Sequence, residues 1–99
     1  MAKGARINRK IAENLAIQAL SLMASDPERL GAFLATTGIG PGAIRKAAAD
    51  PSFLAGVLDH VCGDESLLIA VAGRAGVTPQ DVEHAQAILS GRPWQREVP

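Results

Sequence analysis

Apolar residues recur at intervals of three and four positions along most of the chain, the spacing that gives an α-helix one buried face. No stretch alternates apolar and polar residues over the length of a strand, and no Asn-Gly or Asp-Gly turn separates two β-like runs. The pattern predicts an all-α fold, a compact orthogonal bundle of about five to six short helices. The predicted helices cover residues 9–24, 27–37, 41–49, 51–62, 65–75 and 79–90.

Each predicted helix but the third begins after a residue whose side chain can accept a hydrogen bond from a free amide of the first turn. Proline often follows that residue, because it lacks the amide that would be unpaired there. The predicted caps are Asn8, Asp26, Asp50, Asp64 and Thr78, and Asp81 is spaced to complete a capping box with Thr78. Glycines follow helix ends, where we expect the left-handed conformation. These are Gly38, Gly63, Gly76 and Gly91.

The first predicted helix is apolar around most of its circumference. Its polar residues form one narrow stripe, and the remaining arc runs from Ile11 and Leu15 round to Leu20 and Ile17. A helix of this kind is buried on several sides. We therefore expect it to be the central helix or part of a subunit interface.

The next two helices have narrower apolar faces. In the 27–37 helix we expect three large side chains, those of Leu30, Phe33 and Leu34, to be buried. In the 41–49 helix the residues expected to face inward are Ile44, Ala47 and Ala48.

The composition suits one domain. The chain has 99 residues, 47% of them hydrophobic, with ten basic and ten acidic side chains, which excludes a mainly disordered chain and a strongly basic nucleic-acid binder. We expect a basic flexible arm over residues 1–8, a helical domain over 9–91 and a loose tail over 92–99. The first ten residues carry four basic side chains and no acid. Trp94 is expected to fold back onto the domain.

Three blocks carry a resemblance to a known family: "DPERLGAFLATTGIGPGAIR" at 26–45, "DPSFLAGVLDHVCGDESLLIA" at 50–70 and "AGVTPQDVEHAQAIL" at 75–89. In their order and spacing they resemble a small alphaproteobacterial family catalogued as a domain of unknown function, number 3572. The resemblance spans residues 15–91 and implies a compact helical protein without an assigned activity. It also implies that His60 and Cys62 are local variation, because relatives tend to carry apolar or aromatic residues there.

The one chemically suggestive cluster surrounds Cys62. An imidazole close to a thiol could raise its thiolate fraction, but residues two apart on a helix, such as His60 and Cys62, point in nearly opposite directions. One cysteine and two histidines without ligand spacing do not make a zinc site. We expect no catalytic residues, no metal, no cofactor and no small-molecule substrate.

The turn Gly38-Ile39-Gly40-Pro41 resembles that of a helix-hairpin-helix motif, which presents backbone amides to a nucleic-acid phosphate. In that hypothesis the site residues are Gly38, Gly40, Arg45 and Lys46. The simpler interpretation is structural: Gly38 ends one helix, Ile39 fills the core, and the next helix begins at Pro41.

We therefore expect a non-enzymatic protein–protein interaction module whose partner is an unknown protein or a second copy of the chain. The alternative is a weak nucleic-acid binder that uses the Gly38–Pro41 turn and the basic arm. A single cysteine and the absence of a signal-peptide or membrane-span pattern favour the cytoplasm.

Overall fold

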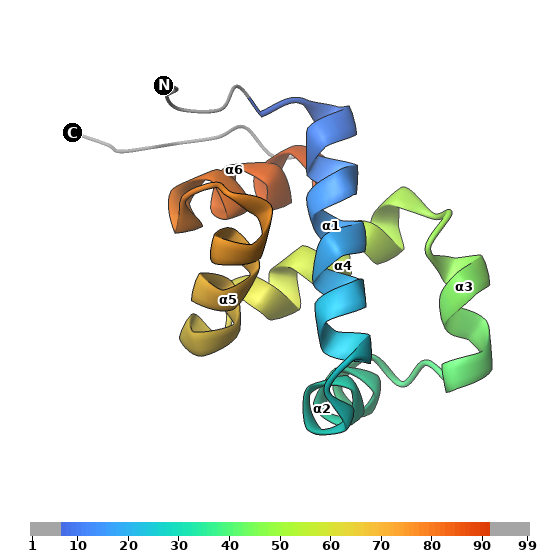
Figure 1. Ribbon diagram of the computed structural model, residues 1–99. Helices are drawn as coiled ribbons and strands as arrows, with labels where there is room; N and C mark the ends of the chain where they lie inside the picture. The colour runs from blue at the N-terminus through green and yellow to red at the C-terminus, as the bar shows by residue number, and fades with distance from the viewer. Residues whose placement is uncertain (1–6, 92–99) are drawn as a thin grey trace.

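Helix α1 (Arg9–Ala24) runs through the middle of the structure, and the other helices are arranged around it (Figure 1). The computed structural model describes residues 7–91, which hold helices and turns and no strand. The all-α prediction is therefore confirmed. Residues 1–6 of the predicted arm and the predicted tail, with Trp94, lie outside the described residues. The remaining helices are α2 (Pro27–Thr37), α3 (Ile44–Ala47), α4 (Pro51–Cys62), α5 (Glu65–Ala75) and α6 (Pro79–Leu89).

The face of α1 that meets the other helices combines an alanine stripe with the larger side chains of Leu15 and Met23. Ala12, Ala16 and Ala19 are fully buried and lie four and three residues apart, so they form one stripe along the helix. Helices α2, α4, α5 and α6 all pack against α1, and α4 and α6 also pack against each other. Because alanine adds only a methyl group, neighbouring backbones can approach α1 closely. The prediction of a central, multiply buried helix is confirmed.

Polar side chains cap the helices as the sequence predicts. The side chains of Asn8, Asp26, Asp50 and Asp64 each accept a hydrogen bond from a first-turn amide of the helix that follows. At α6 the Asp81 amide donates to Thr78 Oγ1 and the Thr78 amide donates to Asp81 Oδ2, both at 3.0 Å. These bonds satisfy donors that the helix itself leaves unpaired. The caps fix where each helix begins.

The glycines that end the helices do not all adopt one conformation. Gly38, Gly76 and Gly91 have φ near +75°, the left-handed conformation expected of them. Gly63 was expected there too, but its φ is −83°. Its amide donates to the carbonyls of Asp59 and His60, so α4 ends in a right-handed turn that leads directly to the Asp64 cap of α5.

The third predicted helix is much shorter than expected. Instead of a helix over 41–49, the chain forms a 3₁₀ turn over Pro41–Ala43 and then the four-residue helix α3. Gly42 disfavours a regular helix, and the segment has only one large apolar side chain, Ile44, with which to anchor itself. Ile44, Ala47 and Ala48 are half-buried rather than buried.

Aromatic packing joins α2 to α4. Phe33 is fully buried, and its ring meets Phe53 edge to face at a centroid distance of 5.9 Å. The other two expected core residues of α2, Leu30 and Leu34, are only half-buried, because α2 packs on the core mainly through Phe33. Ile7, which the sequence places in the basic arm, is buried and belongs to the core.

The packing of α1 predicts that a larger side chain in its alanine stripe destabilises the protein. Ala16→Leu should lower the free energy of unfolding by about 1–3 kcal/mol, because the surrounding backbones must move apart. The matched control is Ala35→Leu on the exposed face of α2, which should change stability by less than about 0.5 kcal/mol. Urea denaturation followed by circular dichroism measures both. Equal effects of the two substitutions would contradict close packing at Ala16.

Candidate functional site

A groove lies between α1, α2 and α3 and has a volume of about 650 Å³. This value falls within the range of roughly 300–1,000 Å³ that is common for binding pockets. Most of its lining is apolar, and Arg45 is the one charged residue in it. The lining residues are Ile17, Leu20, Ser21, Ala24, Leu30, Ile44, Arg45 and Ala48. Ile17 is 41% exposed, although α1 places six other residues in the buried core.

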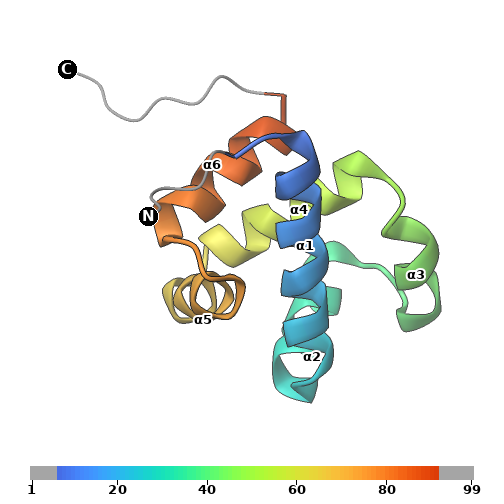
Figure 2. The ribbon, with the colours of Figure 1, turned by 45° about the horizontal axis from the view of Figure 1, so that its top comes forward.

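The groove exists because α3 is too short and too poor in large side chains to close against α1. Figures 1 and 2 show α3 standing on the opposite side of α1 from α5 and α6. Ile44 and Ala48 pack only partly against the core. The apolar residues of α1 that face α3 therefore lack the cover that α4, α5 and α6 give to the rest of the helix.

One positive charge, that of Arg45, lies at the rim of the groove, and Lys46 follows it on α3 without lining the groove. Arg45 and Lys46 are exposed on α3, and no ion pair joins either of them to another of residues 7–91. The nearest acidic side chain along the chain, that of Asp50, accepts hydrogen bonds from the amide and the hydroxyl of Ser52. The positive charge of the rim is therefore not neutralised by the described part of the protein.

The turn that resembles a helix-hairpin-helix motif offers few backbone amides to a phosphate. The amide of Gly38 donates to Leu34 O, that of Ile39 to Thr37 Oγ1, and that of Ala43 to Gly40 O. Pro41 has no amide, so at most those of Gly40 and Gly42 remain within 38–43. The turn also leads into a helix of four residues, which has little dipole to attract an anion. The geometry supports the structural interpretation of this turn better than phosphate binding. Two details of that interpretation were wrong: Ile39 is half-buried and outside the core cluster, and a 3₁₀ turn rather than an α-helix begins at Pro41.

The structure directs His60 and Cys62 to different neighbours. The His60 ring lies edge to face on Phe33 of α2, with centroids 5.3 Å apart. Cys62 is half-buried against the core and interacts electrostatically with Glu83 of α6. Burial, with smaller contributions from the carboxylates of Glu83 and Asp59, raises the pKa of the Cys62 thiol from 9.0 to about 11. The thiol therefore stays protonated at neutral pH, which makes it a poor nucleophile.

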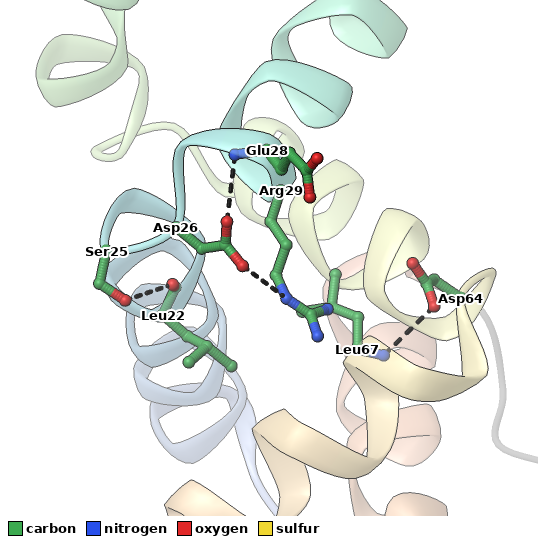
Figure 3. A network of polar contacts seen from close by, with 7 residues as sticks. All are labelled: Leu22, Ser25, Asp26, Glu28, Arg29, Asp64 and Leu67. Carbon is green, nitrogen blue, oxygen red and sulfur yellow. Dashed lines mark hydrogen bonds and ion pairs between the residues drawn. The ribbon is translucent and has the colours of Figure 1, made fainter.

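A second, polar cleft of about 390 Å³ lies where α2 begins and α4 meets α5 (Figure 3). Asp26 accepts from the Glu28 amide at 3.1 Å and pairs with Arg29 at 3.4 Å. Asp64, at the same cleft, caps α5 through the Leu67 amide. These contacts satisfy helix ends, and the Asp26–Arg29 pair lies at the surface, where such pairs contribute little. The cleft is therefore explained as a junction of helix caps.

Two kinds of site are not found among residues 7–91. No group of three or more His, Cys, Asp or Glu side chains is placed to hold a metal ion there. No helix in this part of the chain combines the length and the apolar character needed to cross a bilayer.

These features together define a small all-α protein with an alanine-lined central helix and an open apolar groove with a basic rim. Residues 9–92 match the family described as "protein of unknown function (DUF3572)", and the chain belongs to that family. The family resemblance predicted from the sequence is thus confirmed. No curated protein and no solved structure matches the chain. The matched residues include all six helices that the structure describes, and the family description assigns no activity to them.

The structure brings together only some of the residues that the sequence singles out. Arg45 lines the groove, whereas Lys46 is exposed on α3 without lining it, and Gly38 and Gly40 belong to the turn that leads to α3. Sequence reasoning did not identify Ile17, Leu20, Ala24 and Leu30 as one surface. The available signal was the small-residue content of 42–49, which leaves α3 without the side chains to cover α1.

The environment of Cys62 predicts slow alkylation. At about pH 8 a thiol with a pKa near 11 has a thiolate fraction roughly 100-fold below that of a thiol with a pKa of 9.0. Iodoacetamide should therefore modify the folded protein at least about ten-fold more slowly than a variant carrying Cys62→Ala and the exposed Ala35→Cys, because the greater nucleophilicity of the more basic thiolate offsets only part of its lower abundance. The rate should keep rising as the pH approaches 11. Equal rates for the two proteins at about pH 8, measured by mass spectrometry, would contradict the assigned environment.

Proposed function

We propose that this protein is a non-enzymatic protein–protein interaction module and that the α1–α2–α3 groove is its binding surface. The observation that carries the proposal is the groove itself, an open, mainly apolar surface beside a well-packed core. Binding sites are typically concave and mostly apolar, with a few polar groups that orient the ligand. Single exposed apolar side chains are ordinary, but here Ile17 lies among further apolar residues from three helices.

Two further observations support a binding function over catalysis. The thiol of Cys62 is held protonated at neutral pH, and His60 packs against Phe33 rather than against a nucleophile. In the polar cleft, Asp26 and Asp64 serve helix ends instead of converging on a common point. A single half-buried thiol is compatible with a reducing compartment, so we propose that the module acts in the cytoplasm.

Site-specific photo-cross-linking tests the proposal. Replacing Ile17 by p-benzoylphenylalanine in the cells that naturally make the protein should give a discrete protein adduct on irradiation. The matched control is the same replacement of Ile69 on α5, which is 56% exposed and does not line the groove. The Ile17 adduct should disappear when Ala24→Arg blocks the groove.

Comparing the adducts at Ile17 and Ile69 distinguishes specific binding at the groove from non-specific association of exposed apolar residues. An adduct at Ile17 but not at Ile69, lost with Ala24→Arg, supports the proposal. Equal adducts at both positions, or none at Ile17, would overturn it. Adducts to nucleic acid instead of protein would favour the alternative function through Arg45 and Lys46.

A further inference from the structure

We infer that the occupant of the groove is an amphipathic helix of a partner protein, with apolar residues on one face and acidic residues beside them. The inference rests on the proposed function and adds the chemistry and the shape of the partner. It follows from the dimensions of the apolar lining and from the unpaired positive charge at its rim. The terminal segments of this chain are basic as well, so they do not carry the opposite charge that the rim would attract.

The lining has the length of a short helix contact. On α1 the groove runs from Ile17 through Leu20 and Ser21 to Ala24, positions i, i+3, i+4 and i+7 of one helical face. These positions span about 10 Å, or two helical turns. A partner helix laid beside them would insert side chains that have the same spacing, the arrangement by which amphipathic helices enter apolar grooves. Leu30 and Ile44 would contact these side chains from α2 and α3.

The rim determines the charge of the partner. Arg45 lines the groove and Lys46 follows it, both exposed, while the lining contains no acidic residue. Neither cation has an ion-pair partner within residues 7–91. Glu or Asp residues flanking the apolar face of a docked helix would supply the missing charge. Complementary rim charges chiefly speed the encounter and fix its orientation.

The same charge argues against a second copy of this chain. A symmetric contact between two grooves would bring the Arg45 side chains of both copies to one interface, where like charges repel. The chain's own terminal segments are equally unsuitable. The first ten residues are basic, and residues 92–99 contain Arg92 and Arg96 against the single acid Glu97. An acidic helix from another protein is the occupant that these charges favour.

Designed peptides test the inference without knowledge of the natural partner. Two fluorescein-labelled amphipathic peptides share one apolar face, with Leu at i, i+3, i+4 and i+7, and carry either Glu or Lys elsewhere. A third peptide has the composition of the Glu peptide in scrambled order. Fluorescence anisotropy with the full chain should show the Glu peptide binding at least about ten-fold more tightly than the other two, with affinity falling as salt is raised.

Charge reversal makes the test specific to the rim. The double variant Arg45→Glu/Lys46→Glu should weaken the Glu peptide at least about ten-fold and strengthen the Lys peptide. Ile17→Gln should weaken the binding of the Glu peptide to the otherwise unchanged protein. In the double variant it should likewise weaken the binding of the Lys peptide. Arg74→Glu, an exposed position on α5 outside the groove, is the control and should change nothing. Circular dichroism verifies that each variant is folded.

Each other outcome overturns the inference. These outcomes are equal binding of the three peptides, insensitivity to charge reversal, or preferential binding of a DNA duplex or of phosphatidylserine vesicles through Arg45 and Lys46. Light scattering that detects a dimer abolished by Ile17→Gln would assign the groove to a second copy. A specific cross-link from Ile17 to a partner without an acidic helix would leave the proposed function intact and refute only this inference.

Discussion

Close packing against the alanine stripe of α1 is the constraint on which the rest of the structure depends. Ala12, Ala16 and Ala19 expose no surface, and four other helices meet α1. Side chains of this size allow backbones to approach closely, and tight packing of the larger residues around them gives the core its density. The largest fully buried side chains, including Leu15, Phe33 and Leu67, come from α1, α2, α4, α5 and α6. The core is thus shared by several short helices, none of which could be stable alone.

The same constraint explains the groove. Helices α4, α5 and α6 bring large apolar side chains to α1, but α3 contributes only Ile44 and two alanines of partial burial. A segment that buries so little cannot close tightly over Ile17, so an apolar surface stays open beside the core. Arg45, on the exposed side of the same short helix, then lies at the edge of the groove. The groove and its charge both originate in the composition of residues 42–49.

The helices could be predicted from the sequence because their limits are encoded locally. A cap such as Asp50 and a proline beside it act within one turn, so they mark helix starts without knowledge of the fold. The predictions that were wrong concern positions where local signals do not determine the backbone conformation or the length of the helix. Gly63 is compatible with two backbone conformations, and the immediate start of α5 selects the right-handed one. Helix α3 is short because burial, which is set by the whole fold, does not support a longer one.

The candidate site was less predictable than the fold. The sequence argues on geometric grounds against a shared role for His60 and Cys62, and the two side chains have different neighbours in the structure. It also marks Arg45, though for phosphate rather than for a groove. It could not show that Ile17, Leu30 and Ile44 would meet, because they come from three helices whose relative positions depend on tertiary packing. The sequence shows that α1 is apolar around most of its circumference. It does not show that Ile17 stays exposed, because this depends on the position of α3 in the fold.

Hydrogen exchange of the backbone amides tests the central claim most directly. If α1 is the hub of the core and α3 is a loosely held wall of the groove, amides between Ala12 and Met23 should exchange only through global unfolding. The amides of α3 should exchange through local opening, at least about a hundred-fold faster. Protection of α3 equal to that of α1, or exchange in α1 faster than in α4 and α6, would contradict the account.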